Sequence, residues 1–189
     1  MRQVSRLRKT KMSAHRISEL ERRQANIIRP GTITAADYAT ARVQVQLGQN
    51  VTTWLPWVAG RAGGNRTWNP PEVGEQVLVL SPGGDYACGF VIPGIFQSSF
   101  PANGNSANLW REDFSDGASI QYDRSAHVLT ANIPGGGGIH LTVGGCTMQL
   151  SSTGLTLTGG DIVADGISLK QHTHPGVQTG SGNTGQPVG

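Results

Sequence analysis

The chain has 189 residues, of which 27 are glycine and only 14% are charged, whereas a typical soluble domain has about 25% charged residues. No apolar run approaches the ~20 residues that a transmembrane helix needs, and the basic N-terminus is not followed by an apolar segment, so we expect neither a membrane-spanning helix nor a secretory signal. Much glycine with little charge, together with alternating apolar residues in the second half, indicates an all-β fold rich in turns. The widely separated Cys88 and Cys146 are expected to be free thiols.

Residues 1–30 are predicted to form a basic arm that ends in a short helix. This arm holds nine of the fifteen Lys and Arg residues. The sequence "SELE" from Ser18 matches a capping box, and Pro30 and Gly31 are predicted to stop the helix. One side of the helix carries Ile17, Leu20, Gln24 and Ile27. Because so short a helix is marginal alone, and no aromatic residues interleave with its charges, we expect it to dock on a protein surface rather than on nucleic acid.

Residues 31–97 are predicted to form a small barrel resembling an OB-fold. The segment "ARVQVQL" (41–47) alternates apolar and polar residues, and further short strands follow between Gly, Pro and Asn turns. Large aromatic side chains are predicted to fill the core or to pack in an interface: Trp54, Trp57, Trp68 and Phe90. Aromatic residues on an OB-fold also stack on nucleotides, but no cluster of Lys or Arg accompanies these, so we expect no nucleic-acid partner.

After a predicted linker and β-helix entry segment at 98–117, residues 118–170 carry a series of strands of five to seven residues, separated by glycine or polar turns. Each strand has one narrow apolar face, and no helix is predicted to cover it. An uncovered apolar sheet with open edges would aggregate. The pattern therefore favours an intertwined β-helix made by three copies of the chain over a monomeric solenoid, which would have only about three turns here.

The last segment, 171–189, is predicted to form a metal-binding apex. His172 and His174 lie two residues apart, so on an extended chain they point to the same side. Around a threefold axis they would supply six imidazoles, an octahedral set that suits iron, cobalt or nickel rather than tetrahedral zinc. Pro175 and the glycines after it are small enough for three chain ends to pack into a narrow point. The alternative is a solvated tail with two incidental histidines.

These segments together resemble the central spike, or baseplate assembly protein V, family of contractile phage tails and R-type pyocins. The resemblance lies in "TWLPWVAGRAGGNRTWNPPEVGEQVLVLSPGGD" (53–85), "FVIPGIF" (90–96), "DGASIQYD" (116–123) and the ending "HTHPG" (172–176). It implies an OB-fold that docks on the tail hub, a trimeric β-helix, and one iron ion held at the apex by six histidines, here His172 and His174 of three chains. Calcium or chloride on the β-helix axis is a further possibility that the resemblance raises.

The expected function is mechanical. A homotrimer made in the host cytoplasm would join the baseplate of an extracellular phage tail or pyocin, and sheath contraction would drive it through the target's outer membrane. No catalytic residues are predicted. The alternative, a cell-wall hydrolase, would need a carboxylate pair such as Asp113 with Asp116 or Glu72 with Glu75, and all of these lie in predicted loops. His127 and His140 have no recognisable nucleophile partner. A nucleic-acid-binding OB-fold is the least favoured alternative.

Overall fold

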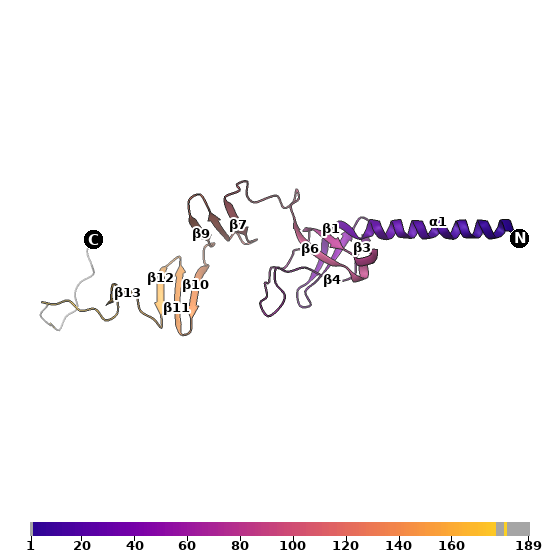
Figure 1. Cartoon of the computed structure of the whole chain (residues 1–189). Coiled ribbons are helices and arrows are strands. Elements are labelled where there is room, and N and C mark those ends of the chain that lie inside the picture. Colours follow the sequence, from indigo (N-terminus) through magenta and orange to yellow (C-terminus); the bar gives the residue numbers. More distant parts are fainter. Residues whose placement is uncertain (1, 177–179, 181–189) are drawn as a thin grey trace. The chain divides into compact units, whose positions relative to one another are not determined.

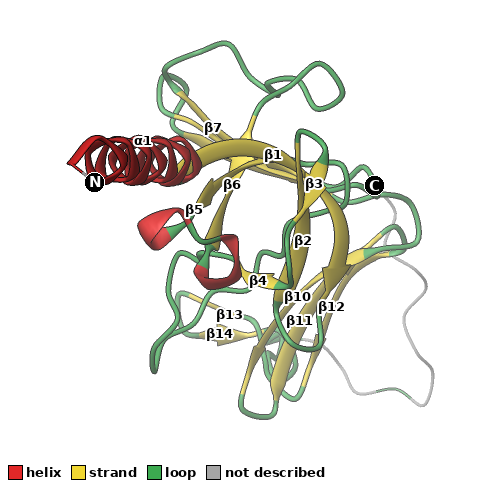
Figure 2. Cartoon of the chain, turned by 90° about the vertical axis from the view of Figure 1, so that its right-hand side faces the viewer, coloured by secondary structure: helices red, strands yellow, loops and turns green. Residues whose placement is uncertain are grey.

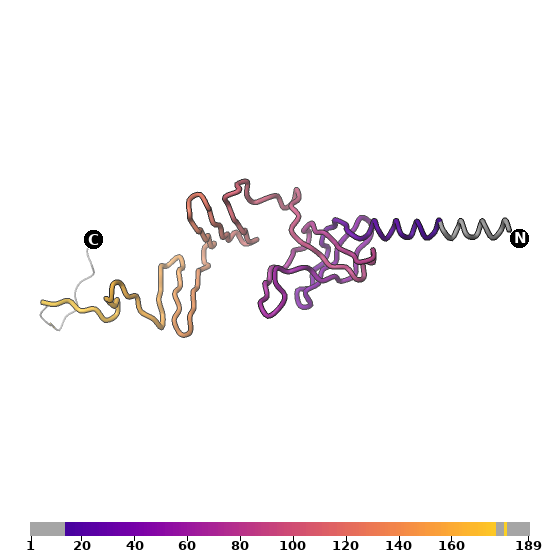
Figure 3. The backbone as a smooth tube through the Cα atoms, in the orientation of Figure 1, coloured from indigo at the N-terminus to yellow at the C-terminus, as the bar shows by residue number. Residues whose placement is uncertain are grey.

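The computed structural model describes residues 2–176 and 180, with side chains from residue 14 onward. The chain divides into two compact units, Met1–Ala102 and Asn103–Gly189 (Figures 1 and 3). Each unit is described separately below. Among the described residues, no helix has the length and apolar character needed to cross a lipid bilayer.

The first unit begins with one long helix, α1 (Arg2–Asn26). The capping-box prediction was wrong, because Ser18 lies well inside the helix and its hydroxyl donates to the Ala14 carbonyl one turn back. A serine hydroxyl can bond backward in this way within a helix interior, so it need not mark a helix start. The helix is followed directly by a strand that begins at Ile28, so the predicted stop at Pro30 and Gly31 was also wrong.

A six-stranded antiparallel sheet follows and curves into a barrel (Figure 2). Its strands are β1 (Ile28–Asp37), β2 (Arg42–Leu47), β3 (Asn50–Val51), β4 (Leu55–Pro56), β5 (Gln76–Leu80) and β6 (Phe90–Ile95). The order is β3-β2-β1-β5-β6, and β4 also pairs with β2. A bridge between Trp57, just after β4, and Val91 in β6 joins the two ends of the sheet. The predicted barrel is thereby confirmed, with its first strand starting three residues earlier than expected.

Aliphatic side chains fill the barrel core, and the prediction of an aromatic core was wrong. The buried cluster is Ile33, Val43, Val45, Leu47, Leu55, Val77, Val79 and Val91. Trp57 is only partly buried against this cluster, whereas Trp54, Trp68 and Phe90 are exposed, Trp68 by 62%. In a small barrel, every second side chain of each strand points inward, and these side chains together fill the narrow interior. Small β-branched side chains suit such positions better than an indole does.

Gly31 is a position in β1 where the backbone lies close against β2. A Cβ atom there would lie 2.5 Å from Val45 Cγ1 and 2.6 Å from Leu47 Cδ2. Neighbouring Pro30 fits in the strand, with Leu78 of β5 opposite it. Both residues therefore belong to the barrel rather than to the arm.

Two short 3₁₀ turns connect β5 to β6 and meet the end of α1. They are η1 (Pro82–Gly84) and η2 (Tyr86–Cys88). A Cβ on Gly84 would lie 2.3 Å from the carbonyl oxygen of Arg23 in the helix. The Tyr86 hydroxyl donates a hydrogen bond to Asn26 Oδ1 and accepts one of 3.0 Å from the Arg29 guanidinium. The end of the helix is thus seated on the barrel.

The second unit is a succession of small antiparallel sheets. The first contains β7 (Leu109–Asp113), β8 (Ser119–Asp123) and β9 (Val128–Asn132); the second contains β10 (Gly138–Val143), β11 (Cys146–Ser151) and β12 (Gly154–Thr158); β13 (Val163–Ala164) and β14 (Ile167–Ser168) form a hairpin. The strands predicted from 118 onward are present. Strand β7 lies inside the segment predicted as a linker.

The β10-β11-β12 sheet has one apolar and one polar face. Its pairing aligns Ile139 with Leu150 and Leu155, and Leu141 with Met148 and Leu157, in rows across the three strands. The alternate positions form the rows His140–Gln149–Thr156 and Thr142–Thr147–Thr158. The apolar rows are largely uncovered: Leu150 is 50% exposed, and Val143, on the same face, is 82% exposed.

Candidate metal centre at the C-terminal apex

The two histidines predicted as metal ligands follow the β13–β14 hairpin. Its turn residues are Asp165 and Gly166, both with positive φ (50° and 86°). An Asp-Gly pair of this kind is the usual sequence of a two-residue hairpin turn. Beyond β14 the Leu169 N–H donates to the Ile162 carbonyl at 2.9 Å. The hairpin thus carries the chain directly into the segment that holds His172.

Asp161 closes the open end of this hairpin. Its carboxylate accepts hydrogen bonds from the Ser168 hydroxyl and from the Lys170 backbone N–H, the latter at 3.2 Å. The Lys170 ammonium group donates to the Gly160 carbonyl beside it. The Ser168 hydrogen bond is the main cause that holds the pKa of Asp161 below its ordinary value, because a carboxylate that accepts hydrogen bonds is stabilised in its charged form.

The ring of His172 is fixed by backbone carbonyl groups. Its Nδ1 atom lies 3.0 Å from the Ser168 oxygen and 3.1 Å from the Leu169 oxygen. Carbonyl oxygens only accept hydrogen bonds, so this network assigns the ring hydrogen to Nδ1. The other nitrogen, Nε2, is then left with its lone pair, which is the state that binds a metal ion.

His174 lies beside His172, with ring centroids 5.1 Å apart and ring planes nearly perpendicular at 83°. Both histidines therefore lie together, as the sequence predicted. In the part of the chain that the structure describes, no group of three or more His, Cys, Asp or Glu side chains is placed to hold a metal ion. One chain offers two imidazoles only, and a complete shell would need several copies of the chain.

The predicted apex extends to Gly189, but most of its tail lies outside the described residues. Sequence reasoning did not identify Asp161, which lies eleven residues before the first histidine. The available signal was the Asp-Gly turn at 165–166, since a hairpin centred there brings the residues just before β13 alongside those just after β14.

The carboxylates that a hydrolase would need have other roles. Asp113 pairs with Arg111 at 2.8 Å, and hydrogen bonding to that guanidinium lowers its pKa. Asp116 accepts from the Ala118 N–H. Glu75 accepts from the backbone N–H groups of Glu72 and Gly94. These acids support turns and strand ends.

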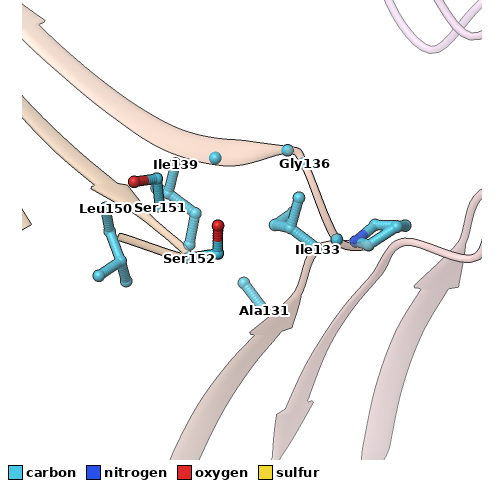
Figure 4. Close-up of a pocket in the computed structure, with 11 residues that line it drawn as sticks. Ala131, Ile133, Gly136, Ile139, Leu150, Ser151 and Ser152 are labelled. Atoms are coloured by element: carbon cyan, nitrogen blue, oxygen red, sulfur yellow. The ribbon is translucent and has the colours of Figure 1, made fainter. Parts of the chain in front are cut away.

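A cavity in the second unit lies between the Gly-rich loop after β9 and the end of β11 (Figure 4). Aliphatic side chains, a run of glycines and two serines line it: Ala131, Ile133, Pro134, Gly135, Gly136, Gly137, Gly138, Ile139, Leu150, Ser151 and Ser152. It contains no acid, base or cysteine. The cavity has the character of a packing surface rather than of an active site.

Comparison with known proteins gives two family matches and one close relative. Residues 29–96 match a family described as the type VI secretion system/phage-baseplate injector OB domain, and residues 166–188 match the GpV Apex motif. The Spike protein of Escherichia phage P2 is 35% identical over 208 aligned positions, which cover 91% of this chain and 97% of that protein.

Proposed function

The chain belongs to the family of phage-baseplate spike proteins, and from this we propose that three copies of it form the central spike that punctures a bacterial outer membrane. Its role in the baseplate is structural. Sheath contraction would supply the force, so the spike needs stiffness and a narrow point.

The observation that carries this proposal is the uncovered apolar surface of the second unit. The barrel has a buried aliphatic core, whereas beyond residue 102 the described part of the chain buries only Ala118 and Ser119, and neither completely. Rows such as Leu141–Met148–Leu157 need a cover, because exposed apolar surface is unfavourable by about 25 cal/mol per Å². Two further copies of the chain cover them symmetrically, which supports an intertwined homotrimer.

The barrel and helix α1 form the end that attaches to the baseplate. Helix α1 carries exposed apolar side chains, Ile17 and Leu20, next to basic ones. An apolar stripe with flanking positive charge suits an acidic protein surface. The tail hub is the proposed partner, and synthesis in the host cytoplasm followed by baseplate assembly is the proposed route.

At the apex, His172 and His174 fit a shared metal ion. Three chains would provide six imidazole nitrogens, and the geometry at His172 leaves Nε2 free to bind. Iron is proposed as the metal. Such an ion would cross-link the three chains at the tip, and a shell of six protein ligands leaves no position for a catalytic water.

A role as an enzyme is not proposed. Asp113 is used in an ion pair, and Asp116 and Glu75 accept backbone hydrogen bonds. Purified protein should release no soluble glycan from bacterial cell walls. Nucleic-acid binding is also not proposed. The exposed Trp54 and Trp68 are aromatic, but beyond residue 30 the chain has six basic and ten acidic residues, which disfavours a polyanion.

Native mass spectrometry with elemental analysis of the purified protein tests both the assembly and the metal. We expect a trimer with about one iron per three chains, the ratio that six imidazoles from three copies provide. Replacing both His172 and His174 by Ala should abolish the metal but leave the trimer, because the apolar rows lie elsewhere. A wild-type monomer would refute the spike assembly. A trimer without metal would refute only the apex site.

A further inference from the structure

The loop that precedes the two histidines is linked to the other side of the hairpin by the Leu169–Ile162 backbone hydrogen bond, by Lys170 and by Asp161. Strands β13 and β14 are paired over only two residues each, too few to fix the chain that follows β14. Among the groups that reach across, the Asp161 carboxylate accepts two hydrogen bonds, from the Ser168 hydroxyl and from the Lys170 N–H.

Ser168 is hydrogen-bonded both to Asp161 and to the residues that lead to His172. Its hydroxyl oxygen also accepts the Gln171 N–H at 2.9 Å, and its carbonyl accepts the His172 N–H at 3.0 Å. The same carbonyl faces His172 Nδ1. Ser168 thus connects Asp161 to His172: its hydroxyl bonds to the Asp161 carboxylate, and its carbonyl bonds to the imidazole ring.

We propose that Asp161 is a positioning residue for the apex metal centre: it holds the Ser168–Gln171 turn so that the turn's carbonyls keep the hydrogen of His172 on Nδ1 and direct Nε2 outward as the metal ligand. This inference rests on the proposed metal centre. It assigns Asp161 no direct contact with the metal. Partners that orient a metal-binding histidine in this way commonly change metal affinity by about 10- to 100-fold.

The first test concerns the tautomer of His172 and requires no metal. In the full chain labelled with ¹⁵N-histidine and treated with a chelator, long-range proton–nitrogen spectra distinguish a protonated Nδ1 from a bare one. We expect His172 to carry its hydrogen on Nδ1. In Asp161→Ala the resonance should become a mixture of tautomers, because the turn no longer holds its carbonyls against the ring.

Two variants control this result. Asp165→Asn removes the same negative charge from the same hairpin and keeps a residue type that tolerates the positive φ of 50° at that turn. It should leave the His172 spectrum unchanged. Asp161→Asn keeps an oxygen that accepts from Ser168 and should lie close to wild type. An unchanged spectrum in Asp161→Ala would overturn the proposal.

The second test measures metal binding itself. Cobalt(II) titration in competition with a chelator gives the affinity, and the intensity of the cobalt absorption bands reports whether the ion is six-coordinate. Asp161→Ala should bind at least tenfold more weakly than wild type, with stronger bands from a distorted shell, and Asp165→Asn should match wild type. Equal affinity in Asp161→Ala and wild type would refute the positioning role.

Ser168→Ala tests whether weaker cobalt binding in Asp161→Ala comes from the lost hydrogen bonds or from a general loss of structure. It breaks the same hydrogen-bond chain from β14 and should weaken cobalt binding in the same direction, while native mass spectrometry shows an unchanged oligomer. If wild type itself binds no cobalt, the apex metal centre fails, and the tautomer measurement still decides whether Asp161 orients His172.

Discussion

Gly31 lies in β1 close against side chains of β2, and comparison with Gly63 shows what this close packing implies. A methyl group at Gly31 would lie 2.7 Å from the Gln46 backbone oxygen as well as against Val45 and Leu47. Gly63 has nothing within 4 Å of the same position. The two glycines therefore differ in packing, and neither has a positive φ.

We predict that Gly31→Ala lowers the unfolding free energy of the barrel by about 1–3 kcal/mol, because the strands must move apart to admit the methyl group. Gly63→Ala should change it by less than about 0.5 kcal/mol, or stabilise slightly through the unfolded chain. Urea unfolding followed by tryptophan fluorescence measures both. Equal midpoints for the two variants would contradict the close approach at Gly31.

At the scale of single elements, helix α1 shows where sequence patterns were misleading. Its first half has no regular apolar stripe, and Arg, Lys, Met and Leu support the helix by intrinsic propensity instead. The apparent cap at Ser18 was a chance match in a continuing helix. Strand β2 was predicted correctly, because Val43, Val45 and Leu47 alternate on the buried face.

Glu19 gives the helix a pH dependence. It pairs with Arg22 and Arg23 at 2.8 Å each, and these hydrogen bonds lower its pKa from 4.5 to about 2. Because the folded pKa lies below the unfolded one, the stabilisation is complete above about pH 4.5 and is lost as the pH falls through about 2. The pairs are exposed, so the effect is small.

We therefore expect Glu19→Gln to have less helix than wild type near neutral pH, and the difference to vanish as the pH falls below about 2. Circular dichroism across this range measures it. Glu21→Gln is the control, since Glu21 forms no ion pair within residues 14–176. A constant difference between Glu19→Gln and wild type at all pH values would show that the ion pairs do not contribute.

At the scale of the whole molecule, substitutions at two neighbouring residues of β11 distinguish an effect on assembly from an effect on folding. Leu150 lies in an apolar row opposite Ile139, whereas Gln149 lies in the polar row opposite His140. Leu150→Asp would bury a charge in the proposed trimer, which is costly without a partner. Gln149→Asp adds the same charge to the polar face.

Light scattering after gel filtration should show Leu150→Asp as a monomer or an aggregate and Gln149→Asp as a trimer. The barrel should remain folded in both, because its core lies in the other unit. A trimer in both variants would show that the apolar rows are not the contact between chains.

The strand positions, the barrel and the closeness of the two histidine rings could be predicted because each depends on local alternation or spacing, while their role as metal ligands stays a prediction. The position of the tryptophans could not, because a preference for burial does not specify whether a curved barrel of this size has room for an indole. Asp161 was missed for a related reason. Its role depends on which residues a two-residue turn brings side by side, and that is a property of the folded hairpin.

The distribution of buried residues also has a consequence for the order in which the two units fold and assemble. The barrel, with its own aliphatic core, occupies the part of the chain that leaves the ribosome first, and domains commonly fold as units during synthesis. The strands with uncovered apolar rows follow the barrel along the chain and so emerge after it. In the proposed trimer, each chain would therefore pair its apolar rows with those of other chains after its own barrel has folded.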